Sequence, residues 1–287
     1  MVEQLRTDGD ADKQAIYRSY RENGFNSSPF VIDIQSLETS PLLDRVQNKP
    51  DVEGALRQLR KKRLDEWKST IFITPQAKAS LKAPDDAHFP LMESVKEFLD
   101  NEQHQVFLLL GDSGAGKSTF NRALECALWD AYRKKDGTIP LYISLPTIDK
   151  PDQDMVTKHL RRLDFTDAQI KELKDHRKLV LICDGYDESQ QTKNLYMANR
   201  LNQPEEWQAK MVISCRSEYI GADYQDRFQP GDRNQLSKAQ FREAVFIPFS
   251  TSQVDDYIDQ YASLFQPLWK AEEYKQASIV SQAWKNW

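Results

Sequence analysis

The stretch GDSGAGKSTF, residues 111 to 120, decides the fold class of this chain. It fits the pattern G-x-x-x-x-G-K-[ST], in which inward-turned backbone N–H groups wrap the phosphates of a nucleotide. Such a loop needs glycine where φ is positive or where a Cβ would collide. The apolar run QVFLLL precedes the loop, and ALECALWDAY, with helical spacing, follows it. This order of strand, loop and helix predicts a phosphate-binding loop.

The positions of this loop have distinct predicted roles. We expect Lys117 to bridge the β- and γ-phosphates and the Ser118 hydroxyl to hold Mg²⁺. The alternative is a glycine-rich turn without a ligand. The other loop residues that we predict to contact the nucleotide are Gly111, Ser113, Gly114, Ala115, Gly116 and Thr119.

Length and composition exclude several classes of protein. A chain of 287 residues can hold one large α/β domain plus smaller elements. Its net charge of -5 argues against a general nucleic-acid surface. The three cysteines show no paired spacing, as is typical of reduced core residues in an intracellular protein. No apolar run approaches the roughly 20 residues that cross a bilayer. We therefore expect a cytoplasmic protein with no membrane or nucleic-acid partner.

Apolar runs alternate with helical stretches along the centre of the chain. The runs cover residues 105–110, 139–145, 178–184, 210–215 and 244–249. Runs that are apolar at nearly every position suit strands covered on both faces, and their alternation with helices indicates a parallel sheet. We predict an α/β fold of the P-loop NTPase type, with a five-stranded parallel sheet and flanking helices.

The chain divides into four predicted segments. A helix over residues 51–67 leads into the core, and a capping box at Ser250 to Gln253 opens a later helix. Two tryptophans lie at helical spacing at the very end, so we expect a truncated piece of a longer protein. The segments are a poorly ordered lead-in (1–50), a helical and extended linker (51–103), a nucleotide-binding domain (104–249) and the start of a helical subdomain (250–287).

Acidic residues follow the third apolar run, in KLVLICDGYDES. Asp184 ends a strand predicted to run beside the loop, where it can accept a hydrogen bond from the water shell of Mg²⁺. Asp187 and Glu188 follow at a distance from which a carboxylate can orient an attacking water. The alternative is an acidic turn after a buried strand. We predict Ser118 and Asp184 as metal-binding residues and Asp187 and Glu188 as catalytic residues.

The fourth apolar run, in KMVISCRSEY, ends at Arg216. If this strand lies between the loop strand and the Asp184 strand, Arg216 emerges facing the γ-phosphate. A guanidinium there can report whether that phosphate is present, because its rigid donors fit phosphate oxygens. The alternative is an ion pair with Glu218 or another surface carboxylate.

Four stretches in order carry a resemblance: GDSGAGKSTF, LVLICDGYDES, MVISCRSEY and AVFIPFSTSQVDDYI. Together they resemble the nucleotide-binding core of the NACHT family, within the STAND class of signal-transducing P-loop ATPases. The resemblance covers about residues 70 to 265, and the DGxDE variant is its specific element. It implies a five-stranded sheet in the order 5-1-4-3-2, followed by a helical domain and a winged helix. It also implies ATP or ADP and Mg²⁺ as cofactors.

The resemblance further implies a mechanism, in which ADP locks a closed monomer and exchange for ATP opens it to self-associate through the NTPase domain. The motif match gives Lys117, Ser118, Asp184 and Arg216 the roles described above, and Asp187 or Glu188 the water-activating role. The chain departs from the family because it ends before the usual nucleotide-contacting proline and histidine, and sensing repeats are missing. Adenine specificity follows from the resemblance alone, with base contacts expected in STIFITPQA, residues 69–77.

Three other functions remain open as alternatives. A GTPase is suggested by N-K-P-D at Asn48 to Asp51, but the run before it is a poor strand and the DxxG motif is missing. A scaffold that holds nucleotide without turnover is opposed by Asp187 and Glu188. A small-molecule kinase is opposed by the lack of an arginine-rich lid segment. We predict an ATP/ADP-binding signalling switch with slow Mg²⁺-dependent hydrolysis.

Overall fold

The structure is a computed structural model that describes residues 50–133, 137–190, 192–221, 224–231 and 236–265. The chain divides into two units, Met1–Asp51 and Val52–Trp287, and the elements described belong to the second. Nearly all of the predicted lead-in and the chain end from residue 266, which includes Trp284 and Trp287, lie outside the described residues. The N-K-P-D motif also begins outside them, at Asn48.

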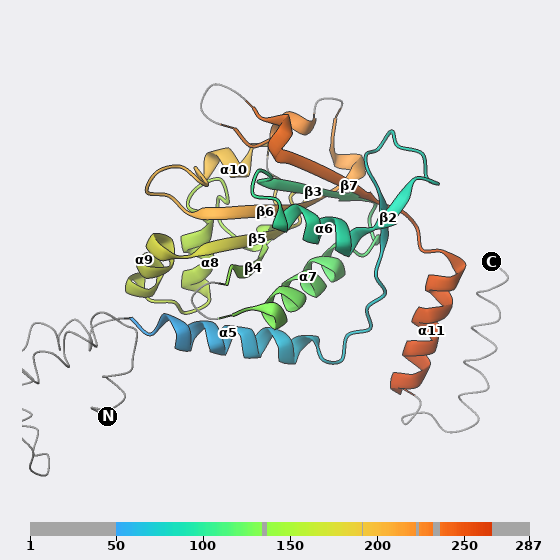
Figure 1. Cartoon of the computed structure of the whole chain (residues 1–287), viewed down its shortest axis with the longest axis horizontal. Helices are drawn as coiled ribbons and strands as arrows, with labels where there is room; N and C mark the ends of the chain where they lie inside the picture. Colours follow the sequence, from blue (N-terminus) through green and yellow to red (C-terminus); the bar gives the residue numbers. More distant parts are fainter. Residues whose placement is uncertain (1–49, 134–136, 191, 222–223, 232–235, 266–287) are drawn as a thin grey trace, which may run out of the picture. The chain divides into compact units, whose positions relative to one another are not determined.

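A mixed sheet of seven strands forms the centre of the described part of this unit, in the order β2-β1-β7-β3-β6-β5-β4 (Figure 1). Its strands are β1 Gln76–Lys78, β2 His88–Pro90, β3 Val106–Gly111, β4 Ile139–Ser144, β5 Lys178–Asp184, β6 Gln208–Arg216 and β7 Phe241–Phe246. The prediction of a five-stranded parallel sheet is wrong. Strands β3 to β7 pair in parallel, but β1 joins β7 in the antiparallel direction and β2 joins β1 likewise.

The sequence pattern did not predict β1 and β2, and it placed the start of β7 too late. Strands β1 and β2 have three residues each, too few for a recognisable alternation or apolar run. Strand β7 begins at Phe241, whereas the predicted strand began at residue 244. The prediction began too late because Arg242 and Glu243 interrupt the apolar run. It ends before Pro248, which lacks the N–H that a ladder needs.

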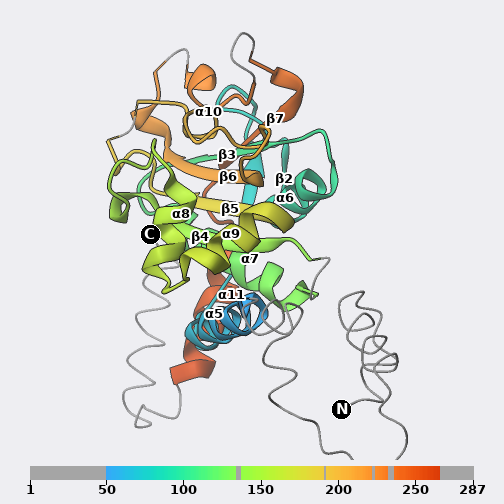
Figure 2. The same ribbon diagram turned by 90° about the vertical axis from the view of Figure 1, so that its left-hand side faces the viewer.

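Helices cover both faces of the sheet (Figure 2). The described α-helices are α5 Val52–Trp67, α6 Leu91–Asp100, α7 Lys117–Ala131, α8 Met155–Arg162, α9 Asp167–His176, α10 Leu195–Ala198 and α11 Thr251–Phe265. Short 3-10 helices are Leu145–Thr147, Ser217–Tyr219, Tyr224–Arg227 and Lys238–Gln240. Buried side chains of α6 and of the first part of α7 pack on one face, and those of α8, α9 and α10 pack on the other.

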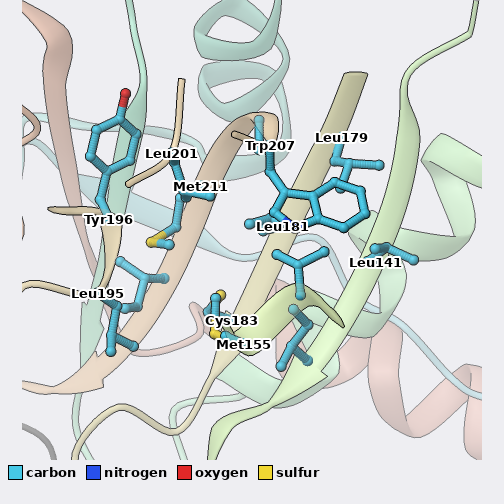
Figure 3. Packing of buried hydrophobic residues seen from close by; sticks show 14 of the residues in the cluster. Leu141, Met155, Leu179, Leu181, Cys183, Leu195, Tyr196, Leu201, Trp207 and Met211 are labelled. Atoms are coloured by element: carbon cyan, nitrogen blue, oxygen red, sulfur yellow. The ribbon is translucent and has the colours of Figure 1, made fainter. Parts of the chain in front are cut away.

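The central strand β3 shows how the two faces arise. Val106, Leu108 and Leu110 belong to one buried cluster, whereas Phe107 and Leu109 belong to the other, as the two-residue period of a strand requires. Figure 3 shows part of the first cluster, in which side chains of β4, β5 and β6 meet those of α8 and α10. Because both faces of the sheet are buried, the apolar runs in the sequence are nearly continuous.

Parallel pairing brings the functional segments to one edge of the sheet. The register pairs Gly111 at the end of β3 with Arg216 at the end of β6. On the other side, Asp184 at the end of β5 pairs with Ser144 of β4, and Cys183 pairs with Ile213 of β6. The phosphate-binding loop, the acidic turn and Arg216 therefore lie at the carboxyl ends of neighbouring strands, where open α/β sheets bind ligands.

Candidate nucleotide-binding site

The loop requires glycine at its three glycine positions for two different physical reasons. Gly114 and Gly116 have φ of 79° and 88°, in the left-handed region that side-chain-bearing residues rarely adopt. At Gly111 the constraint is space, since an added Cβ would lie 3.0 Å from the Cβ of Phe246. The loop leads directly into α7, whose first residue is Lys117. The N-terminus of this helix therefore points its free N–H groups into the loop.

The Lys117 side chain folds back over the loop. Its Nζ donates hydrogen bonds to the carbonyl oxygens of Gly111 at 2.6 Å and Asp112 at 2.7 Å. Burial lowers the pKa of this ammonium, and the nearby Asp187 carboxylate opposes that shift. The Lys117 amine thus lies over the loop and beside the start of α7, an arrangement suited to an anion.

One cavity of about 280 Å³ collects nearly all of the predicted site residues. Of these residues, Gly111 alone does not line it; it is buried at the end of β3. Gly185 and Ser214 line the cavity in addition, and the sequence analysis did not select them as site residues. The predicted residues in the lining are Ser113, Gly114, Ala115, Gly116, Lys117, Ser118, Thr119, Asp184, Asp187, Glu188 and Arg216.

The acidic turn after β5 is built around Gly185, whose φ of 79° turns the chain away from the strand. Asp184 remains buried, and its carboxylate accepts hydrogen bonds from Asn121, Tyr142 and Ser214. None of these three partners was predicted. A polar residue within the run MVISC and an asparagine one turn after Ser118 were usable signals, but nothing in the sequence singled out Tyr142.

Arg216 lies against the two other carboxylates of the turn. Its Nε is 2.9 Å from Oδ2 of Asp187, and its backbone N–H donates to Oδ1 of the same residue at 3.0 Å. Its Nη2 donates to Oε1 of Glu188 at 3.1 Å. The alternative partner Glu218 lies farther away, at 3.9 Å. The side chain of Asp187 is 7% exposed and that of Glu188 is 56% exposed, so the two carboxylates differ in access to solvent.

Comparison with known protein families assigns the chain to a family. Residues 105–264, more than half of the chain, match the family model of the NACHT domain. The chain belongs to the NACHT family. It therefore carries a nucleotide-binding P-loop NTPase module. No curated protein sequence matches the chain.

One solved structure matches the chain with low sequence identity and a low TM-score. It is a chain of the E. coli MS115-1 HORMA:CdnC:Trip13 complex, with 13% sequence identity and a TM-score of 0.31. The match covers 81% of this chain and 74% of that chain.

A second cavity of about 470 Å³ lies beside the phosphate-binding loop. It shares Ala115, Gly116 and Thr119 with the first cavity, so the two adjoin. The expected base-contacting stretch contributes Ser69 to Ile73 and Pro75, and strand β7 contributes Phe246. Its remaining lining residues are Phe249, Tyr257, Tyr261 and Leu264.

Helix α11 is joined to this stretch by its first turn. Gln253 Nε2 donates to the carbonyl oxygen of Thr74 at 2.8 Å. The predicted capping box is present, since Gln253 N–H donates to Ser250 Oγ and Ser250 N–H donates to Gln253 Oε1. The helix therefore brings aromatic and aliphatic side chains beside the loop.

The donor set of the first cavity fits Mg²⁺. Ser118 and Asp184 supply the hard oxygen ligands that this ion prefers, and Mg²⁺ usually takes one or two carboxylates together with phosphate oxygens. Within the described ranges there is no group of three or more histidine, cysteine or acidic residues that could hold a metal. Likewise, no helix in those ranges is long and apolar enough to cross a membrane.

Proposed function

We propose that this NACHT domain is a signalling switch that binds ATP or ADP with Mg²⁺ and hydrolyses ATP slowly. The observation that carries the proposal is the pair of adjoining cavities. One is lined by the loop, Asp184 and Arg216, and the other mostly by apolar side chains. A polar cavity for phosphates beside an apolar cavity for a base fits the two ends of a nucleotide.

The first step is capture of the phosphates by the loop. Phosphate oxygens would replace the carbonyl oxygens of Gly111 and Asp112 as acceptors for Lys117. The N–H groups at the start of α7 add donors and a favourable helix dipole. Ser118 and Asp184 would hold Mg²⁺, which supplies positive charge against the phosphates when it is bound.

The structure supports different roles for the two carboxylates that the sequence left as alternatives. Asp187 accepts a hydrogen bond from the Arg216 backbone N–H, forms an ion pair with the Arg216 guanidinium and is nearly inaccessible, so we assign it to holding Arg216. Glu188 accepts one hydrogen bond from Arg216 and is exposed. We assign the orientation of the attacking water to Glu188, because a general base must reach a mobile water.

Arg216 connects nucleotide state to this chemistry. A γ-phosphate in the cavity would compete with Glu188 for the Nη donors of Arg216, since guanidinium groups pair well with phosphate. Binding of ATP, but not of ADP, would then release Glu188. This difference between the two nucleotides is what a switch needs.

The second cavity, which we propose for the base, connects nucleotide binding to α11. One of its walls belongs to the core and another to α11, so an adenine there would fix α11 against the loop. We propose that the nucleotide domain spans residues 104–249 and the helical subdomain begins at residue 250. We also propose that the release of Glu188 from Arg216 in the ATP state permits self-association through the NTPase domain. The protein is proposed to be cytoplasmic, consistent with three free, buried cysteines.

A nucleotide-binding scaffold without turnover is the second candidate. The observation in its favour is that Arg216 pairs with both Asp187 and Glu188, so each of the two predicted catalytic carboxylates already has a cationic partner. A measurement of phosphate release from ATP separates the two functions, because a scaffold would bind ATP and release none.

The experiment that tests the proposal is denaturation of the purified protein, followed by chromatography of any released nucleotide. Stoichiometric ADP would support a switch resting in its ADP state. For an empty protein, we expect added ATP and ADP to bind, and Arg216→Ala to narrow the preference for ATP over ADP. Binding of neither nucleotide to the wild-type protein would overturn the proposal.

A further inference from the structure

Three donors hold the buried carboxylate of Asp184. The amide Nδ2 of Asn121 donates to Oδ1 at 2.7 Å, and the Ser214 hydroxyl donates to the same oxygen at 2.6 Å. The Tyr142 hydroxyl donates to Oδ2 at 2.9 Å. Asp184 is 8% exposed, and Asn121 and Ser214 are at most 1% exposed. Both oxygens of the carboxylate are therefore fixed by neighbouring side chains.

These donors come from three different elements that meet at the end of β5. Tyr142 lies on β4 and Ser214 on β6, the two strands that flank β5 in the sheet. Asn121 lies on α7, one turn after Ser118, so the two residues share a face of the helix. The helix that carries the predicted Mg²⁺-binding hydroxyl thus also fixes the predicted Mg²⁺-binding carboxylate.

Ser214 connects the other members of this hydrogen-bond network. Ser214 Oγ accepts from Asn121 Nδ2 at 3.2 Å and from the Gly185 N–H at 3.3 Å while it donates to Asp184. The Tyr142 ring lies under the Arg122 guanidinium, whose carbon is 4.5 Å from the ring centroid. The tyrosine is therefore anchored independently of its hydroxyl.

The network leaves the Asp184 carboxylate free to accept one more contact from the phosphate cavity. A carboxylate offers about four lone-pair positions, and three donors occupy three of them. Asp184 lines the phosphate cavity, but Asn121 and Tyr142 do not. Tyr142 consequently acts on the cavity through the carboxylate that it holds, and Asn121 acts through that carboxylate and through Ser214.

We infer that Asn121, Tyr142 and Ser214 are positioning residues, which orient Asp184 toward the Mg²⁺ of the bound nucleotide. The inference rests on the proposed function, because it needs a Mg²⁺-nucleotide in the cavity. Partners that orient a metal-binding group typically change metal affinity by roughly 10- to 100-fold when they are removed. Tyr142 is the most informative of the three, since it provides the described hydrogen bond to Oδ2.

The test is the Mg²⁺-dependent gain in ADP affinity, measured by titration calorimetry on the full chain in Mg²⁺ and in EDTA. Tyr142→Phe keeps the ring and its stacking on Arg122 but removes the hydroxyl. We expect the affinity in EDTA to stay within about twofold of wild type and the gain from Mg²⁺ to fall about tenfold. The matched control is Tyr132→Phe, which removes another buried hydroxyl, one bonded to Arg177; it should leave the gain unchanged.

A second pair of variants covers the other carboxylate oxygen. Ser214→Ala removes a donor to Oδ1, whereas Ser214→Thr keeps the hydroxyl, so the gain should fall in the first and be restored in the second. An unchanged gain in both Tyr142→Phe and Ser214→Ala would overturn the inference. So would an equal loss of affinity in EDTA and in Mg²⁺, which indicates a general structural effect.

The wild-type protein separates the two proposals. If it binds ADP equally well in Mg²⁺ and EDTA, the positioning role is overturned while nucleotide binding stands. If it binds no nucleotide under either condition, the proposed function is overturned and this inference with it.

Discussion

At the scale of single residues, the site depends on which polar groups already have partners. Lys117 donates to two loop carbonyls, Asp187 is held by Arg216, and Glu188 shares that arginine while remaining exposed. These differences in partners and in exposure are the basis of the separate roles that we propose for Asp187 and Glu188, which the sequence left as alternatives.

Lys117 gives the most direct residue-scale prediction. Lys117→Ala should lower ADP affinity by at least about 100-fold, because the variant loses a charge-assisted contact to the phosphates. The unfolding temperature without nucleotide should change little, since the lost bonds are to the loop itself. Binding is measured by calorimetry, with Lys171→Ala, an exposed lysine, as the control. Retained affinity would refute the assignment of the loop.

The two carboxylates of the turn give the second prediction. Glu188→Gln should leave nucleotide affinity near wild type and slow phosphate release at least tenfold, because an amide cannot take up a proton from water. Asp187→Asn should destabilise the protein by about 1 to 3 kcal/mol, because the nearly buried side chain loses its ion pair with the Arg216 guanidinium. Urea unfolding and a phosphate-release assay measure both effects. Unaltered hydrolysis in Glu188→Gln, together with its loss in Asp187→Asn, would reverse the assignment.

At the scale of elements, helices are attached to the core by buried polar groups as well as by apolar side chains. Arg63 of α5 pairs with the buried Glu125 of α7 at 3.3 Å, and Arg177 after α9 pairs with Glu53 of α5 at 2.6 Å. Helix α8 buries His159 on its apolar face. Burial, followed by the charges of Arg63 and Arg162, lowers the pKa of His159 to about 4.

His159 therefore predicts a pH dependence of stability. Because the folded-state pKa lies below the unfolded value near 6.5, the unfolded chain binds more protons between these two values. The free energy of unfolding should fall as pH decreases from about 6.5 toward 4, by about 3 kcal/mol from this residue once both values are passed. His159→Leu should flatten that part of the profile, measured by urea unfolding from pH 7 to 4.5.

The matched control for His159→Leu is His88→Leu, which replaces an exposed histidine on β2. It should leave the slope between pH 7 and 4.5 as in wild type. A profile of His159→Leu that keeps the wild-type slope would show that other groups account for it.

At the scale of the whole described unit, the second cavity is lined both by the sheet core, through Phe246, and by α11, through Tyr257 and Leu264. The hydrogen bond from Gln253 to Thr74 attaches α11 to the segment that precedes β1. A ligand that binds both sides stabilises the folded state by mass action. The nucleotide should thus act as a link between the core and the segment that follows it.

The corresponding prediction concerns stabilisation by ADP. Mg²⁺ and ADP at about 100 times the dissociation constant should raise the free energy of unfolding by about 2.7 kcal/mol. Replacing Tyr257 and Leu264 together by alanine should weaken ADP binding about tenfold through lost apolar contact with the base. Thermal shift assays with and without ADP measure both.

Substitution of Leu81, an exposed leucine outside the second cavity, by alanine is the control for the double variant. It should bind ADP like wild type. Equal stabilisation of wild type and the double variant by ADP would show that α11 takes no part in binding.

The sequence alone determined the local and periodic features of this protein. The loop, the DGYDES turn, the parallel strands β3 to β7 and the capping box of α11 could be predicted because each is encoded by neighbouring residues or by a short period. The tertiary structure decided what depends on contacts between distant segments. Strands β1 and β2 exist through pairing, and Asn121, Tyr142 and Ser214 meet at Asp184 through the sheet register and the placement of α7. Such contacts leave no periodic signal, because each partner is separated from the others by tens of residues along the chain.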